Sequence, residues 1–226
     1  GAALAVEWAK RGARLILSAR SKDRLAEMIA MLGPEHTALP LDVADRASID
    51  AAIATLGSID RVVNLAALYD PGKISELDPE TAQQIVAVNF MGSFHIAQRA
   101  PSVLRVGGQI ALCGSVAGYI GLPQGQIYSA TKAAVINLAE SLRAELVGRY
   151  DVRLISPGFV DTRLTQRNNF AMPGLTTPHN AACAIIDGLN ARRFEIHFPK
   201  RLTRAMKLLR ALPYWAALPL TQRLSQ

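Results

Sequence analysis

The chain has 226 residues, of which 50% are hydrophobic and 19% charged, a composition that supports a globular core and excludes a disordered or low-complexity chain. Its longest apolar runs are too short to cross a bilayer, and its two cysteines, Cys113 and Cys183, fit neither a disulfide framework nor a zinc site. The net charge of +7 arises within residues 190–226, where eight Lys/Arg accompany one Glu, so the remainder is neutral. We therefore expect a cytoplasmic protein without a metal site.

Short β-branched segments alternate with segments of helical periodicity along the first 160 residues. This alternation predicts a doubly wound, Rossmann-type α/β fold with a parallel sheet. We expect a single domain over residues 1–198, followed by a basic tail over 199–226. Strands are expected at 14–19, 37–41, 60–65, 109–114 and 152–156, and helices at 2–11, 22–32, 46–56, 79–99 and 126–148. The chain opens on a helix, whereas this fold needs a strand in front of it, and we expect about ten residues to be missing there.

The spacing of one pair of residues indicates a catalytic role. Tyr128 and Lys132 lie four residues apart and so share one face of the expected helix at 126–148. An ammonium ~4 Å from a phenolate is worth ~4 kcal/mol at an effective dielectric constant of ~20, enough to lower a tyrosine pKa from ~10 towards ~7. Such a tyrosine is usable as a general acid or base. Ser115 directly follows an expected strand, at the sheet edge where ligands bind in such folds.

Ser115, Tyr128 and Lys132, together with Asn89 in Val-Asn-Phe-Met-Gly, resemble the active-site tetrad of the short-chain dehydrogenase/reductase family. The resemblance implies that Tyr128 exchanges a proton with the substrate oxygen and that Ser115 hydrogen-bonds this oxygen. Lys132 would lower the pKa of the tyrosine and hold the ribose of a nicotinamide cofactor. Asn89 would bind, through its backbone, a water that relays protons to Lys132.

Further motifs after successive strands resemble the cofactor-binding segments of this family. They begin at Asp42, at Asn64 in Asn-Leu-Ala-Ala, and at Pro157 in Pro-Gly-Phe-Val-Asp-Thr. Of the family's Gly-rich fingerprint only the last glycine has a counterpart, Gly1. The resemblance implies cofactor contacts from Gly1, Ser18, Arg20, Asp42, Val43, Asn64, Ala66, Tyr128, Lys132, Pro157, Gly158, Val160 and Thr162.

The residues that end the second strand of the family pattern favour NADP over NAD. A carboxylate at this position would bind the ribose 2′-hydroxyl of NAD and repel a 2′-phosphate. The position carries Ala19, and Arg20 follows it. A guanidinium pairs a phosphate bidentately, whereas the alternative is a solvated basic helix start.

The resemblance implies an NADP-dependent oxidoreductase that transfers hydride between the cofactor and a carbonyl or alcohol. Substrate contacts are expected from residues 116–126 and from the segment after Thr162, both mostly apolar, which favours an apolar small molecule. Two alternatives stay open. One is an epimerase or dehydratase that recycles bound nicotinamide, and the other is a non-enzymatic NADP-binding sensor or scaffold at a membrane surface.

The tail predicts an amphipathic helix between Pro199 and Pro213. A basic amphipathic helix followed by Tyr and Trp is typical of peripheral membrane contact through residues 200–215, and the alternative is packing on the body or on a sister subunit. No nucleic-acid-binding module accompanies the charge, so no nucleic-acid partner is expected. The family resemblance implies a homodimer or homotetramer formed by the helices at 79–99 and 126–148. The expected apolar face contains Leu202, Ala205, Met206, Leu208, Leu209 and Leu212, and the basic face contains Arg204, Lys207 and Arg210.

Overall fold

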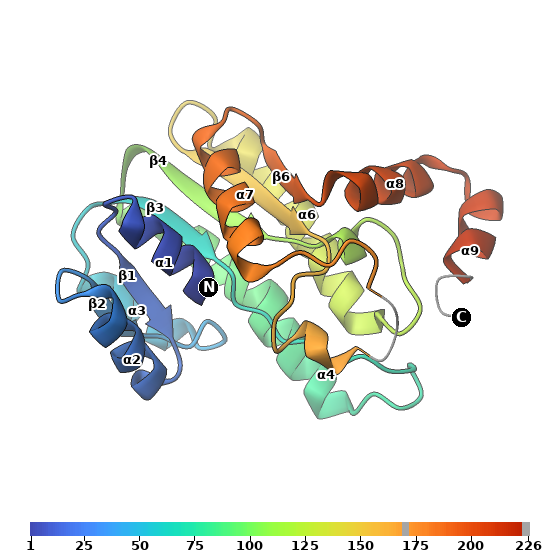
Figure 1. Ribbon diagram of the computed structural model, residues 1–226, viewed down its shortest axis with the longest axis horizontal. Helices are drawn as coiled ribbons and strands as arrows, with labels where there is room; N and C mark the ends of the chain where they lie inside the picture. Colours follow the sequence, from blue (N-terminus) through green and yellow to red (C-terminus); the bar gives the residue numbers. More distant parts are fainter. Residues whose placement is uncertain (169–171, 223–226) are drawn as a thin grey trace.

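Parallel strands form the central layer of the computed structural model, which describes residues 1–168 and 172–222 (Figure 1). Hydrogen bonds join them as a two-stranded sheet, β1-β2, and a four-stranded sheet, β3-β4-β5-β6, so the central layer divides between β1 and β3. The strands are β1 (Ile16–Ala19), β2 (Thr37–Pro40), β3 (Ile59–Asn64), β4 (Leu104–Cys113), β5 (Asp151–Pro157) and β6 (Glu195–Phe198).

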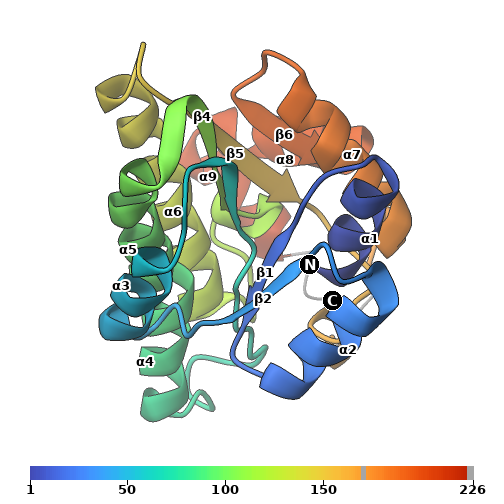
Figure 2. The same cartoon turned by 90° about the vertical axis from the view of Figure 1, so that its left-hand side faces the viewer.

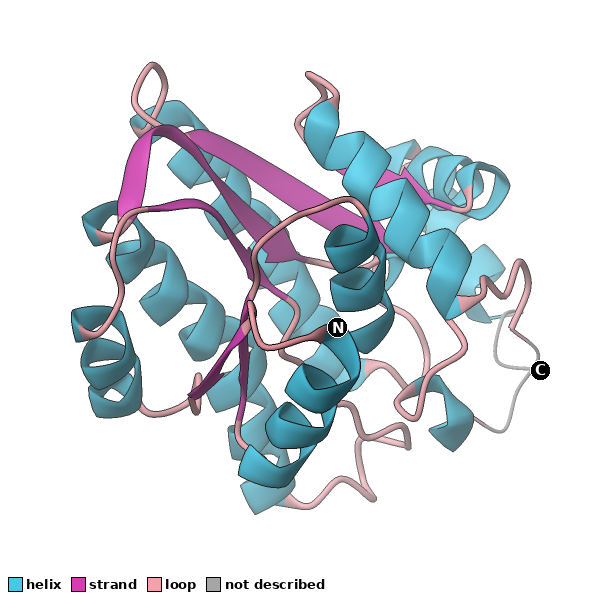
Figure 3. Cartoon of the chain, turned by 60° about the vertical axis from the view of Figure 1, so that its left-hand side comes forward, coloured by secondary structure: helices cyan, strands magenta, loops and turns pink. Residues whose placement is uncertain are grey.

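Helices cover both faces of this layer, as a doubly wound fold requires. Figure 2 shows α3, α4, α5 and α6 on one side of the strands and α1, α2 and α7 on the other, and Figure 3 shows the strands between these two layers. The helices are α1 (Ala2–Lys10), α2 (Lys22–Leu32), α3 (Arg46–Ala54), α4 (Pro79–Val86), α5 (Gly92–Arg99), α6 (Gln126–Glu145), α7 (Pro178–Asn190), α8 (Lys200–Ala211) and α9 (Tyr214–Gln222).

The core lies on both faces of the four-stranded sheet. On β4, Ile110 and Leu112 face α6 and pack with Val135, whereas the intervening Ala111 belongs to the cluster that contains Ile186 of α7. A strand buried on both faces reads as a continuous apolar run rather than an alternating one. The predicted Rossmann-type parallel fold is therefore confirmed.

Several boundaries differ from the expected ones. The helix predicted at 79–99 is divided into α4, a π-helical turn (Ala87–Met91) and α5. The strand predicted to start at Gln109 starts at Leu104. β6 was not predicted, because its four residues, Glu195–Phe198, give too short a pattern to recognise. The helix α7 was not predicted either.

The tail helix α8 packs on the body, and part of its predicted amphipathic pattern is wrong. Met206 is buried, but Leu208 of the expected apolar face is 68% exposed. Lys207 of the expected basic face is not a free surface cation, because it forms an ion pair with Glu195 of β6 while its side chain stays 41% exposed. The contacts of α8 thus favour packing of its apolar side on the body of the protein. Residues 223–226 of the tail lie outside the described residues. Within the described ranges, no helix has the length and apolarity needed to cross a membrane.

Candidate active site

Ser115 lies just past the carboxyl end of β4 and starts a 3-10 turn (Val116–Gly118). Its Oγ accepts a 3.1 Å hydrogen bond from the amide of Ala117. A Cβ added at Gly118 would come within 2.6 Å of the carbonyl carbon of Lys132, so the turn touches the backbone of α6 directly. This close approach, which needs a glycine, holds Ser115 against the helix that carries Tyr128.

The structure brings Ser115, Tyr128 and Lys132 together. The hydroxyl of Ser115 lies near enough to the Tyr128 phenol to act on the pKa of that phenol. The Nζ of Lys132 lies 5.6 Å from the centre of the Tyr128 ring and donates a 2.8 Å hydrogen bond to the main-chain carbonyl of Cys113. The three residues expected from the sequence therefore share one buried site at the end of β4.

Burial dominates the electrostatics of this site. The side chain of Lys132 is fully buried, and this burial lowers its pKa. Burial likewise raises the pKa of the Tyr128 phenol, the nearby Cys113 raises it further, and the Ser115 hydroxyl opposes the shift. The predicted fall of the tyrosine pKa towards 7 is therefore wrong for this structure, because the phenol is removed from water and the Lys132 ammonium is bonded to the Cys113 carbonyl instead.

Asn89 lies in the π-helical turn between α4 and α5 and is fully buried. Its Nδ2 donates to the carbonyl of Leu68 at 2.9 Å and to Oγ1 of Thr131 at 3.2 Å, and its Oδ1 accepts from the amide of Leu68 at 2.7 Å. Its main-chain carbonyl accepts a 2.6 Å bond from Ser93 Oγ. The side chain thus ties the loop after β3 to α6, one residue before Lys132.

Tyr69, which the sequence analysis missed, completes the wall of the site. Its ring packs edge-on against Tyr128 with ring centres 4.7 Å apart, and its hydroxyl donates to Asn168 Oδ1 at 2.7 Å. Burial raises the pKa of Tyr69. Its place in a loop, five residues after Asn64, gave no periodic signal that would have revealed it.

The residues expected after β2 and β3 form local turns. Asn64 Oδ1 accepts from the amide of Ala66 at 3.2 Å, and its Nδ2 donates to Ser93 Oγ at 3.1 Å. Asp42 Oδ1 accepts from the amide of Ala44 at 2.9 Å. Val43 packs on α5, where its side chain leaves no room for a Cβ at Gly92.

The remaining candidates lie at other positions along the same edge. Pro157 ends β5, the amide of Gly158 donates to Phe198 at 2.7 Å, and Val160 forms an isolated bridge with Thr176. Thr162 is exposed, and its amide donates to Thr165 Oγ1 at 3.0 Å. A Cβ added at Gly1, which precedes α1, would meet no atom within 4 Å. Ser18 is an exposed residue of β1. Arg20 is exposed and pairs with no residue that the structure describes.

The segment predicted to contact substrate lines a cavity of about 580 Å³. Residues 117–122 form one wall, and α6 and the segment from Arg210 to Ala217 form the others. Ser115, Tyr128 and Lys132 are not among the lining residues. The cavity is thus a neighbour of the catalytic candidates, not the space that they face. Residues 169–171 of the other predicted substrate segment lie outside the described residues.

A family model for short chain dehydrogenases matches residues 1–172. The chain belongs to the short-chain dehydrogenase family. It is 36% identical over 169 residues to a sorbitol dehydrogenase of Cereibacter sphaeroides, covering 71% of this chain and 66% of that protein. It is 32% identical over 184 residues to 11-beta-hydroxysteroid dehydrogenase 1A of Arabidopsis thaliana, covering 77% of this chain and 53% of that protein. The aligned part therefore spans less than two thirds of each of these relatives.

Solved structures show the same fold. A short-chain dehydrogenase/reductase from Burkholderia phymatum in complex with NAD superposes with a TM-score of 0.81 at 24% identity, covering 91% of this chain and 87% of that chain. A short-chain dehydrogenase from Sphingobium yanoikuyae in complex with NADPH gives 0.80 at 24% identity, covering 99% and 89%. These likenesses establish the architecture of this short-chain dehydrogenase and leave its cofactor preference to its own residues.

Proposed function

We propose that this short-chain dehydrogenase is an NADP-dependent oxidoreductase that transfers hydride between the cofactor and a carbonyl or alcohol. The observation that carries the proposal is the meeting of Ser115, Tyr128 and Lys132 at the end of β4. A phenol, a hydroxyl and an ammonium at one buried point form a set suited to protonating a carbonyl oxygen.

In the direction of carbonyl reduction, Tyr128 donates the proton. Burial raises the pKa of this phenol, so the proton is present at neutral pH. Ser115, whose hydroxyl lies near the phenol, is placed to donate to the same substrate oxygen. Lys132 supplies a buried positive charge beside the developing negative charge, and Asn89 holds the adjacent Thr131 in place.

The residues at the carboxyl edge of the sheet fit a dinucleotide. Gly1 immediately precedes α1 and so stands at a helix start, the kind of position at which a pyrophosphate binds. Arg20 is an exposed cation with no partner among the described residues, so its guanidinium is free to pair a 2′-phosphate. When bound, the cofactor supplies or accepts the hydride, while Lys132 is the side chain expected to hold its nicotinamide ribose.

The substrate is a small carbonyl or alcohol compound of apolar character, and the enzyme acts as a homodimer or homotetramer. The named relatives act on a polyol and on hydroxysteroids, respectively, so their names agree on the reacting group and not on the molecule. Tyr69, whose ring packs on Tyr128, adds an aromatic surface beside the reacting group.

Oxidation of NADPH and of NADH, measured with a panel of aldehydes and ketones, tests this proposal. Carbonyl-dependent net oxidation, faster with NADPH, is the expected result. An epimerase or dehydratase would convert substrate without net oxidation, and a sensor would bind NADPH without turnover. Either outcome contradicts the proposal.

A further inference from the structure

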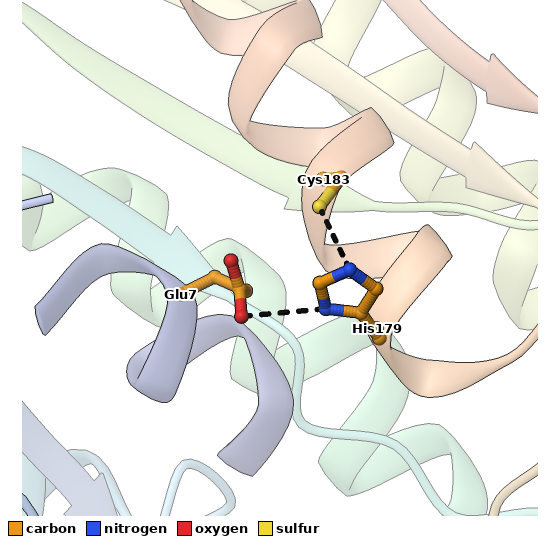
Figure 4. Close-up of side chains that lie close together, drawn as sticks. All are labelled: Glu7, His179 and Cys183. Atoms are coloured by element: carbon orange, nitrogen blue, oxygen red, sulfur yellow. Dashed lines mark hydrogen bonds and ion pairs between the residues drawn. The ribbon is translucent and has the colours of Figure 1, made fainter. Parts of the chain in front are cut away.

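Outside the candidate active site, three side chains meet where helices α1 and α7 lie side by side (Figure 4). The Oε1 of Glu7 lies 3.3 Å from Nδ1 of His179, and the other ring nitrogen, Nε2, lies 3.8 Å from the Sγ of Cys183. The imidazole therefore stands between a carboxylate and a thiol and directs one nitrogen to each. This is the order of nucleophile, base and orienting acid that activates a thiol.

The fold holds these groups in place. His179 and Cys183 are four residues apart in α7 and so share one helix face. Helix α1, which carries Glu7, packs on α7 through a buried cluster that includes Leu4 and Ala182. The Glu7 side chain is only 10% exposed, whereas that of His179 is 65% exposed. The carboxylate is therefore held in place, and the imidazole is open to solvent.

Two cations flank the group. Lys10 Nζ donates to Glu7 Oε1 at 3.1 Å, and this hydrogen bond is the main cause that lowers the pKa of Glu7, which keeps it a carboxylate. The guanidinium of Arg11 lies 3.9 Å from the Cys183 sulfur, so a second positive charge stands beside the attacking atom.

The same contacts disfavour a metal ion at this place. One ion takes a single nitrogen of His179, whereas here the two nitrogens serve two different partners. Lys10 and Arg11 would also repel a divalent cation. The cluster is therefore better suited to moving a proton than to holding a metal.

We propose that Cys183 is a nucleophilic thiol that forms mixed disulfides with low-molecular-weight disulfides, with His179 as its general base and Glu7 orienting the imidazole. The Cys183 proton passes to Nε2 of His179 as the sulfur attacks one sulfur of the disulfide. A Cys183–sulfur bond forms, the original S–S bond breaks, and the departing thiolate takes the proton from the imidazolium. One half of the reagent is thus bound and the other leaves as a thiol, with no further oxidant. A disulfide needs no oxyanion hole, unlike an acyl group.

Glutathione disulfide is the probe, applied in excess to the full chain at neutral pH. The sequence contains only two cysteines, so peptide mass spectrometry follows Cys183 and Cys113 in the same sample. We expect Cys183 to be modified at least ~10-fold faster than Cys113, and His179→Gln to slow Cys183 by at least ~100-fold, because general-base catalysis contributes about 10²- to 10⁴-fold. Glu7→Gln should slow the modification of Cys183 less than His179→Gln does. Glu140→Gln, an exposed carboxylate-to-amide change on α6, is the matched control and should leave the rate unchanged.

The rate for Cys113 reports whether a variant has disturbed the fold, and it should stay constant in every variant. An unchanged Cys183 rate in His179→Gln overturns the proposal, as does equal modification of the two cysteines in the unaltered chain. Stoichiometric Co²⁺ binding with a thiolate charge-transfer band would assign the cluster to a metal and overturn it too. None of these readouts depends on dehydrogenase turnover.

Discussion

The ammonium of Lys132 is hydrogen-bonded at 2.8 Å to the main-chain carbonyl of Cys113, the last residue of β4. This bond joins α6 to the strand that ends two residues before Ser115. Lys132 therefore positions the two other members of the site as well as contributing charge. Its burial at 2% exposure means that the ammonium has the protein, and not water, as its surroundings.

Replacement of Lys132 by methionine removes the charge and the bond to Cys113 while keeping an unbranched side chain. We expect turnover to fall by at least ~100-fold, because both the positioning and the electrostatic contributions are lost. Stability should change little or rise, since burial of an ammonium is costly. Steady-state kinetics and thermal unfolding check the two parts. Turnover within a factor of ~3 of the unaltered enzyme would contradict the role given to Lys132.

The raised pKa of Tyr128 predicts different pH dependences for the two reaction directions. The phenol remains protonated below its ordinary pKa of ~10, so the rate of carbonyl reduction should be flat between about pH 6 and 9. Alcohol oxidation needs the phenolate, whose population grows about tenfold per pH unit in this range. The rates of both directions over this range check the prediction. A plateau of the oxidation rate below about pH 8 would mean that the phenol titrates near neutrality, as the spacing to Lys132 alone suggested.

The sequence predicted the parts of this site that depend on spacing along the chain. The helix face shared by Tyr128 and Lys132, and the place of Ser115 directly after a strand, both follow from local pattern. The sign of the Tyr128 pKa shift does not, because burial results from the packing of segments distant in sequence. Tyr69 was missed for the same reason, and Lys207 was assigned to solvent because its partner Glu195 lies on an unpredicted strand.

Arg20→Glu should reverse the cofactor preference. A charge-assisted hydrogen bond to a phosphate is worth ~1.5 to 3 kcal/mol, so we expect kcat/KM for NADPH to fall by about 10- to 150-fold. The value for NADH should stay equal or rise, because a carboxylate accepts bonds from a ribose hydroxyl. Kinetics with both cofactors measure the ratio.

Arg24→Glu is the matched control, because Arg24 is also exposed and makes the same change of charge nearby on α2. If the two variants lose NADPH activity equally, the effect is one of general charge and Arg20 has no special role.

Glu195 links α8 to the body through Lys207 and Tyr119. Burial raises the pKa of this carboxyl, but hydrogen bonds from Lys207 and Tyr119 outweigh burial and hold the pKa below its ordinary value. A lowered pKa in the folded state contributes stability above the unfolded value of ~4.3, and this contribution is lost as the pH falls through the folded value. Glu195→Gln should thus destabilise the protein by ~1 to 3 kcal/mol at pH ~7.

Denaturant unfolding at neutral and at acidic pH measures this difference, which should shrink below about pH 4. Glu76→Gln, at an exposed pair with Lys73, is the control and should cost under ~1 kcal/mol. A loss for Glu195→Gln that is equal at both pH values would contradict the assigned role of the carboxylate.

The most direct measurement is carbonyl-dependent NADPH oxidation by Tyr128→Phe, with NADPH affinity determined on the same sample. Tyr69→Phe serves as the control, because it removes a hydroxyl from the neighbouring ring and leaves the Tyr128 phenol in place. With Tyr128 as the proton donor, Tyr128→Phe loses at least ~100-fold in turnover and keeps its NADPH affinity, while Tyr69→Phe stays active. Turnover by Tyr128→Phe at the rate of the unaltered enzyme would contradict this assignment.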